Sequence, residues 1–204
     1  NMEKYISKKE KASYGFAAVG SYMVAGITQS YLMYFFTDIL IIPSAFVMVL
    51  MIVARVWDAL NDPMMGVIVD RTSTKYGKMR PYVLIGSFLM LVTTIVLFMP
   101  LTGAPTMFKM IFAAVSYIIF GMAYTLTDVP AMGLMSVATP NSDERASLLS
   151  FYVTVGSVGS LLPVGLLTIF QSFIPEKYVY FAMSIFVGII TSAAYLTLFK
   201  NSKE

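Results

Sequence analysis

The stretch RVWDALNDPMMG at residues 55–66 decides the fold, because it places charged side chains in the middle of a long apolar run. The run extends from Ser44 to Val69 and carries no other charge. About 20 mostly apolar residues in a helix cross the roughly 30 Å hydrocarbon core of a bilayer. An ionisable side chain at that depth costs roughly 2.5–3.5 kcal/mol on insertion scales. The stretch therefore predicts a membrane helix that carries a polar site.

The composition of the chain also excludes an ordinary soluble domain. Of its 204 residues, 58% are hydrophobic and 12% are charged, against about 45–50% and 25% in soluble domains. The chain has no Cys and no His, which removes disulfides, thiol nucleophiles, and the commonest general base and metal ligand. We therefore expect a membrane protein that is not an enzyme and holds no cofactor.

Long, mostly uncharged segments predict an all-α membrane protein with six transmembrane helices in one domain, residues 1–204. The fourth segment is either long or broken at Pro130, since proline removes a helical hydrogen bond. The first segment is too long for a cleaved signal peptide and is expected to stay as a helix. The predicted helices cover about 12–37, 44–69, 81–100, 107–133, 147–171 and 178–199.

The distribution of basic residues predicts the orientation in the membrane. Eleven of the 14 Lys and Arg residues lie before the first helix, between helices two and three or four and five, or after the sixth helix. The basic side of a membrane protein faces the cytoplasm, so both termini are expected there. We interpret the basic residues behind the net charge of +3 as residues that set the topology and contact the headgroups of the lipid bilayer. No nucleic-acid partner is expected.

Arg55, Asp58 and Asp62 are spaced i, i+3 and i+7, so their side chains share one stripe of the second helix. Asp128 is the fourth ionisable residue at membrane depth. One Arg against three ionised Asp leaves two uncompensated negative charges, which an apolar environment resists. Either a mobile cation or protons cancel these charges, or the stripe is an ion-pair zipper in which one carboxylate pairs with Arg55 and another is protonated or bonds a neighbouring helix.

Proline and threonine add oxygen ligands to this stripe. Pro63 and Pro130 lack an N–H, so the carbonyl one turn before each proline loses its helical partner. Such carbonyls, hydroxyls and carboxylates form the hard oxygen set that binds Na⁺ in transporters, while carboxylates alone carry H⁺. The alternative is that both prolines only bend their helices. The added oxygens are the carbonyls of Ala59 and Leu126 and the hydroxyls of Thr125 and Thr127.

Small residues predict close helix contacts in the first and fifth helices. Tyrosines combine a ring with a hydroxyl, which suits a polar ligand as well as an aromatic belt at the membrane surface. Tyr124 lies one turn from Asp128, which favours the ligand for that residue. The small residues are Gly15, Gly20, Gly26, Gly156, Gly159, Ser160 and Gly165.

Two further segments carry a family resemblance. The chain reads GVIVDRTSTKYGKMRPY at residues 66–82 and GMAYTLTDVP at residues 121–130. Together with residues 55–66, these segments resemble the glycoside-pentoside-hexuronide:cation symporters, the melibiose carrier-like family of the major facilitator superfamily. The loop motif of this resemblance comprises Gly66, Asp70, Arg71, Lys75, Gly77, Lys78 and Arg80.

The resemblance implies a fold of twelve helices in two halves, each with three-plus-three inverted repeats and with the solute between the halves. This chain would be the N-terminal half only. The C-terminal half of the same transporter is then the expected partner. It would be the continuation of a longer protein, a separate chain, or a second copy of this one.

For the cation, the resemblance implies that Asp58 and Asp62 bind the coupling ion, which would be Na⁺ or H⁺. It implies that Thr125 is a further cation ligand and that Arg55 is a charge partner near the site. These positions include the stripe that the spacing of the charged residues predicts on its own.

For the sugar, the resemblance implies that Tyr124 and Asp128 face the solute, and Tyr22 is a further candidate contact. The chain departs from melibiose carrier-like members at several positions, so another sugar, a uronide or a different small solute is left open. Ser21 and Tyr22 stand where a Lys-Asp pair is usual, Met132 stands in place of an aromatic residue, and Val153 in place of an arginine.

We therefore predict a secondary transporter that couples Na⁺ or H⁺ to the transport of a sugar or glycoside across the bacterial cytoplasmic (inner) membrane. Cation and solute would each bind better in the other's presence, by typically 1–3 kcal/mol. Two alternatives use the same six helices. One is a non-transporting membrane scaffold or partner subunit, and the other is a carrier for a lipid-like solute.

Overall fold

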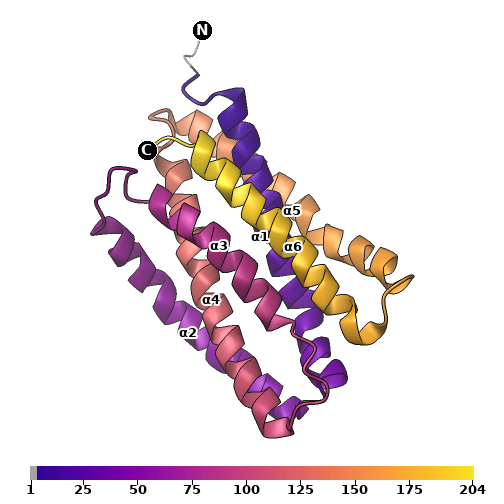
Figure 1. Cartoon of the computed structure of the whole chain (residues 1–204). Coiled ribbons are helices and arrows are strands. Elements are labelled where there is room, and N and C mark those ends of the chain that lie inside the picture. The colour runs from indigo at the N-terminus through magenta and orange to yellow at the C-terminus, as the bar shows by residue number, and fades with distance from the viewer. Residues whose placement is uncertain (1–3) are drawn as a thin grey trace.

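The computed structural model describes residues 4–204, so the first three residues of the predicted domain lie outside the described part. Six long α-helices run side by side, and no strand occurs in the described part (Figure 1). This confirms the predicted all-α, six-helix fold. The helices are α1 (Lys8–Tyr34), α2 (Ser44–Asp70), α3 (Arg80–Leu97), α4 (Thr106–Val137), α5 (Ser142–Gln171) and α6 (Glu176–Asn201).

Five of these helices, α2 to α6, are long and apolar enough to cross a membrane. The remaining helix, α1, is as long as α2, at 27 residues. It begins with a run of charged residues and is rich in Gly, Ala and Ser. It packs against both α5 and α6. Small side chains allow such close approach between membrane helices, so the lower hydropathy of α1 reflects its place inside the bundle.

Capping residues extend some helices beyond their apolar runs. The side chain of Asn141 accepts hydrogen bonds from the backbone N–H groups of Asp143 at 2.9 Å and Glu144 at 3.1 Å. This is a typical N-cap, and it starts α5 at Ser142 rather than near the predicted residue 147. At the fourth helix, α4 continues without a break through Pro130 to Val137, so of the two alternatives the structure has the long helix.

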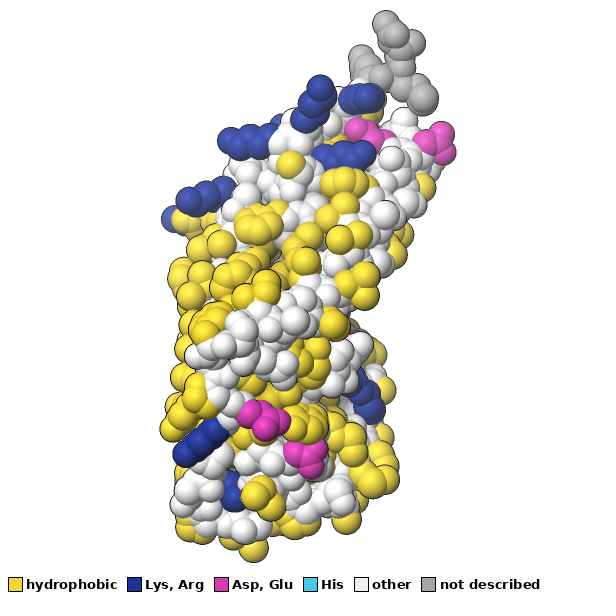
Figure 2. Space-filling model, turned by 90° about the vertical axis from the view of Figure 1, so that its right-hand side faces the viewer, with side chains coloured by type: hydrophobic (Ala, Val, Ile, Leu, Met, Phe, Trp, Pro, Cys, Tyr) yellow, Lys and Arg dark blue, Asp and Glu magenta, His cyan; other side chains and the backbone are white. Residues whose placement is uncertain are grey.

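The packing of the helices leaves α2 and α5 at opposite sides of the bundle (Figure 1). α1 packs against α5 and α6, α3 packs against α4 and α6, and α2 packs mainly against α4. Many apolar side chains of α2 and α5 are exposed, among them Ile52, Leu60 and Leu161. Figure 2 shows one face of the molecule with hydrophobic side chains over most of its length, with Lys and Arg side chains at the end that holds both termini and a few more towards the opposite end.

The small residues of α1 and α5 are where these two helices touch. A Cβ added to Gly159 would lie 2.9 Å from the Cα of Val19, and one added to Gly26 would lie 2.8 Å from the carbonyl oxygen of Ser160. Real Cβ atoms essentially never lie less than 3.0 Å from such atoms, so only glycine fits at these two positions without a shift of the backbone. The predicted close contacts are therefore present at these positions, whereas a Cβ on Gly165 would meet nothing within 4 Å.

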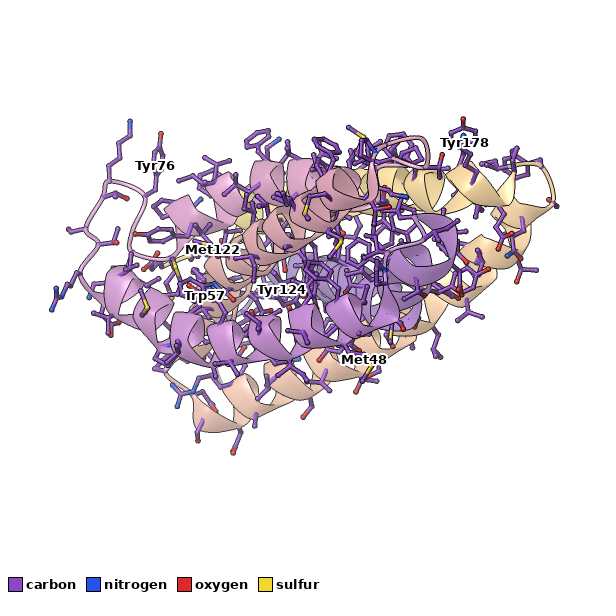
Figure 3. All side chains as sticks on the ribbon, turned by 90° about the horizontal axis from the view of Figure 1, so that it is seen from below. Met48, Trp57, Tyr76, Met122, Tyr124 and Tyr178 are labelled. Atoms are coloured by element: carbon purple, nitrogen blue, oxygen red, sulfur yellow. The ribbon has the colours of Figure 1, made fainter. Side chains whose placement is uncertain are left out.

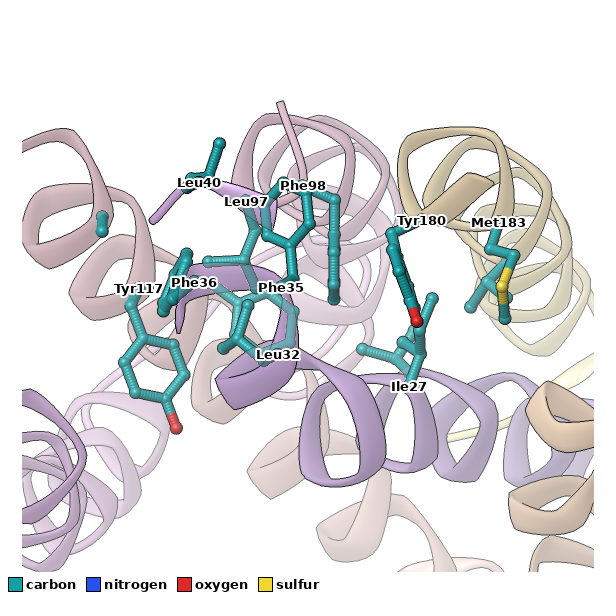
Figure 4. Close-up of a cluster of buried hydrophobic side chains, with 14 of the residues drawn as sticks. Ile27, Leu32, Phe35, Phe36, Leu40, Leu97, Phe98, Tyr117, Tyr180 and Met183 are labelled. Atoms are coloured by element: carbon teal, nitrogen blue, oxygen red, sulfur yellow. The ribbon is translucent and has the colours of Figure 1, made fainter. Parts of the chain in front are cut away.

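An aromatic cluster fills the core at the end of the bundle opposite the termini (Figure 4). There α1 passes into a short π-helix, η1 (Phe35–Ile39). The ring of Phe35 lies 5.3 Å from that of Phe98 and 6.1 Å from that of Tyr180, centroid to centroid. Such pairs contribute about 0.5–1.5 kcal/mol each beyond their buried area. The Nζ of Lys109, which is buried, donates to the carbonyl of Leu40 at 2.5 Å.

The predicted loop motif connects α2 to α3 at the end that holds the termini. Gly77 has a φ of 103°, a backbone conformation that glycine adopts without strain. The carboxylate of Glu204 accepts hydrogen bonds from the backbone N–H groups of Lys78 at 2.7 Å and Met79 at 2.9 Å. The guanidinium of Arg80 donates to the carbonyl of Phe199 at 2.6 Å and lies 4.7 Å from its ring centroid. The motif therefore joins α3 to the end of α6.

Replacing Arg80 with Met is expected to lower the free energy of unfolding by about 1–3 kcal/mol, because a hydrogen bond from a charged donor and a cation–π contact are lost together. The measurement is thermal unfolding of the detergent-solubilised protein. Lys75→Met serves as a control, since Lys75 lies over the ring of its sequence neighbour Tyr76 and so links no two helices by this contact. Equal stability of the two variants would contradict a role for Arg80 in joining the helices.

Candidate functional site

A polar cavity opens between α1, α2 and α4. Figure 3 places Trp57 of α2 and Tyr124 of α4 between Tyr76 at one end of the molecule and Tyr178 at the other, and both residues line this cavity. It is therefore an intramembrane cavity. Its other polar and charged lining residues are Thr28, Gln29, Arg55, Asp58, Asp62, Tyr117, Thr125 and Asp128.

Arg55 and Asp58 form an ion pair one helical turn apart on α2. An Nη of Arg55 lies 3.3 Å from Oδ2 of Asp58, and its other Nη donates to the hydroxyl of Tyr117 on α4 at 3.5 Å. Gly121 lets Asp58 approach α4, because a Cβ at that position would lie 3.2 Å from Oδ1 of Asp58. One of the three acids thus has a basic partner within the chain.

Asp62 has a different environment. Its Oδ1 accepts a hydrogen bond from the hydroxyl of Thr125 at 2.8 Å, which links α2 to α4 across the cavity. Within residues 4–204, the only ion pair is that of Arg55 with Asp58, so no basic side chain neutralises Asp62. The carboxylate and the hydroxyl leave oxygen lone pairs facing the cavity, which a cation or a proton would satisfy.

Asp128 lies where this cavity meets a second one. The second cavity shares Ala25, Gln29, Tyr124 and Asp128 with the first. Asp128 makes no ion pair with any residue of the described part. The other lining residues of the second cavity are Tyr22 and Gly26 from α1, Met132 from α4, and Tyr152 and Ser160 from α5.

Three tyrosines line the second cavity together with Asp128. Tyr124 shares a hydrogen bond of 3.1 Å with the hydroxyl of Ser21. The ring of Tyr22 meets the ring of Tyr152 edge to face at 6.2 Å between centroids. The hydroxyl of Tyr152 is buried and has no hydrogen-bond partner within the described residues. An acid, hydroxyls and aromatic rings in one concave site are the groups that bind a polyhydroxylated solute.

The structure brings together the residues that the family resemblance implies for cation and solute. Asp58, Asp62 and Thr125 line the first cavity, Tyr22 lines the second, and Tyr124 and Asp128 line both. Val153 lines neither cavity. The residues of the loop motif lie outside both cavities.

The predicted oxygen set needs a correction. The hydroxyl of Thr127 donates to the carbonyl of Ala123 at 2.8 Å within α4 and is buried, so its inclusion was wrong. The carbonyl-bearing residues Ala59 and Leu126 line neither cavity. No group of three acidic side chains in residues 4–204 is close enough to hold a metal ion by itself.

Gln29 was missed by the sequence analysis, although it lines both cavities. The signal was present, because Tyr22, Ala25 and Gln29 follow the same i, i+3, i+7 spacing that identified the acidic stripe of α2. An uncharged amide in an apolar helix attracts less attention than a carboxylate, since it costs less to bury.

A six-helix membrane bundle with an acid-lined cavity at the level of its helix centres has the architecture of half a secondary carrier. The model of a family described as MFS/sugar transport protein matches residues 13–204. The chain therefore belongs to this family of the major facilitator superfamily, which confirms the resemblance drawn from the motifs. The family consists of transport proteins, in agreement with the prediction that the chain is not an enzyme.

Curated relatives carry the names of symporters. The chain is 37% identical over 161 residues to "Uncharacterized symporter YjmB" of Bacillus subtilis (78% of this chain, 35% of the relative). It is 34% identical over 161 residues to "Inner membrane symporter YicJ" of Escherichia coli (77% and 34%). It is 31% identical over 203 residues to "Putative glycoside/cation symporter YagG" of Escherichia coli (98% and 44%). The chain thus spans less than half the length of these relatives.

Proposed function

We propose that this chain is the N-terminal half of a cation-coupled symporter for a sugar or glycoside. The observation that carries the proposal is the environment of Asp62, which faces an intramembrane cavity without a basic partner and is bonded to Thr125 across α2 and α4. A carboxylate at membrane depth with no basic partner requires a mobile positive charge. A scaffold of paired charges would account for Arg55 and Asp58 but not for Asp62 and Asp128.

Coupling follows from the way the two cavities meet. A cation between Asp62 and Thr125 removes negative charge next to Asp128, which lies at the junction of the cavities. The solute then binds with its hydroxyls at Asp128, Tyr124 and Tyr22. Because binding free energies are reciprocal, the solute also raises the affinity for the cation. Na⁺ and H⁺ both fit this scheme, since Asp62 can coordinate the one or bind the other.

The complete carrier in this proposal contains a C-terminal half that closes the open side of both cavities. The relatives are more than twice as long as the parts that this chain matches, which supports a second half. We place the carrier in the bacterial inner membrane with both termini in the cytoplasm, where the basic end of the bundle would lie.

The experiment is uptake into proteoliposomes that contain the full-length carrier. Labelled glycosides are offered with an inward Na⁺ gradient, with an inward H⁺ gradient, and with neither. We expect one gradient to stimulate uptake and its ionophore to abolish the stimulation. Sugar uptake that neither gradient changes would refute cation coupling, and uptake of no sugar under any condition would refute sugar transport.

A further inference from the structure

The two cavities contain an excess of negative charge. Asp58, Asp62 and Asp128 line them, against Arg55. Arg55 lines only the first cavity, where it is paired with Asp58 and bonded to Tyr117. No other Lys or Arg of residues 4–204 lines either cavity.

Two further basic side chains of the bundle, Lys109 and Arg80, are held away from the cavities. Lys109 donates to the carbonyl of Leu40 in the opposite end of the molecule, and Arg80 donates to the carbonyl of Phe199 at the end with the termini. The wall of the second cavity consists of tyrosines, Gln29, Met132, Ser160 and small residues around Asp128. This wall offers hydrogen bonds but no positive charge.

One bound monovalent cation reduces the formal charge of the cavities from −2 to −1, so the site stays negative when loaded. A second negative charge next to Asp128 would be repelled, and like charges brought together away from water discriminate strongly against a ligand. A neutral polyol instead donates its hydroxyls to the carboxylate and accepts from the tyrosine hydroxyls.

Resting on the proposed function, we infer that the carried solute is an uncharged glycoside and that this half of the carrier rejects sugars bearing a carboxylate or a sulfonate. The specificity lies in the missing basic partner at the second cavity. Gln29 is the position where a charge would change it, since Gln29 is exposed and lines both cavities.

The test measures the exchange of labelled solutes across the membrane of proteoliposomes that contain the full-length carrier, with matched pairs of solutes as probes. Each pair consists of a methyl glycoside and the uronide that has a carboxylate in place of its CH₂OH group, in the gluco and galacto series. We expect the neutral member of at least one pair to exchange about 10-fold or more faster than its uronide.

Two variants at one position separate charge from shape. Gln29→Arg is expected to reduce the preference for the neutral member by about 10-fold, because it supplies a basic partner, while Gln29→Met keeps the preference of the wild type. Uronide exchange as fast as neutral exchange in the wild type would overturn the inference and leave the proposed function standing. An unchanged preference in Gln29→Arg would also overturn it. Exchange of neither member of any pair would refute the proposed function, and the inference with it.

Discussion

Asp62→Asn in the full-length carrier is expected to abolish the effect of the cation on sugar binding. The amide keeps the size of the side chain and an oxygen that accepts from Thr125, so the variant removes the charge and little else. A coupling cation typically raises solute affinity 5–150-fold, and this gain should disappear. The measurement is sugar binding titrated at several Na⁺ concentrations and several pH values.

Asp143→Asn is the matched control for that substitution. Asp143 is exposed in the first turn of α5 and lines neither cavity. Its loss should leave the cation dependence as in the wild type. If the sugar affinity of Asp62→Asn still rises with the cation to the same extent, Asp62 is not the coupling residue.

Gly159→Leu is expected to destabilise the carrier, with a loss of folded protein in the membrane. An added Cβ there would lie 2.9 Å from the Cα of Val19 and 3.0 Å from its carbonyl oxygen, and backbone atoms cannot move aside without separating α1 from α5. Overpacking of a tight contact costs about 1–3 kcal/mol and sometimes more, against a total stability of roughly 5–15 kcal/mol. The measurement is the yield of monodisperse protein after detergent extraction.

The control for this substitution lies on the same helix. Gly165→Leu places an identical side chain where no atom lies within 4 Å of the new Cβ, so its yield should match that of the wild type. Equal loss of protein in both variants would indicate that α5 tolerates no large residue, and would remove the special role of the contact with Val19.

Much of the fold was predictable because hydrophobic length is nearly sufficient to define membrane helices. The ends of the helices were less predictable. α5 begins at Ser142 because of the Asn141 cap, and this local hydrogen bonding lies outside the apolar run that identifies the span. The continuity of α4 through Pro130 was also undecided from sequence, since a proline inside a membrane helix can either bend or break it.

The site was predictable where charge made it visible. The stripe of α2 was evident from spacing alone, because charges at membrane depth are costly. The pairing of Arg55 with Asp58 follows from their i, i+3 spacing on one helix, whereas the hydrogen bond between Asp62 and Thr125 depends on how α2 and α4 approach each other. Helical spacing within one segment contains no information on that approach. Thr127 was misassigned for a different reason, because residues two apart on a helix do not face the same side, and Thr127 lies against Gly86 of α3.

α2 contacts the rest of the bundle mainly through α4, and the proposed ion ligands Asp62 and Thr125 lie on those two helices. An occupied site would therefore add a link between α2 and the helix that holds it in the bundle. Binding and release of the ion would strengthen and weaken the attachment of one outer helix, so the packing of α2 would differ between the ion-bound and the ion-free carrier.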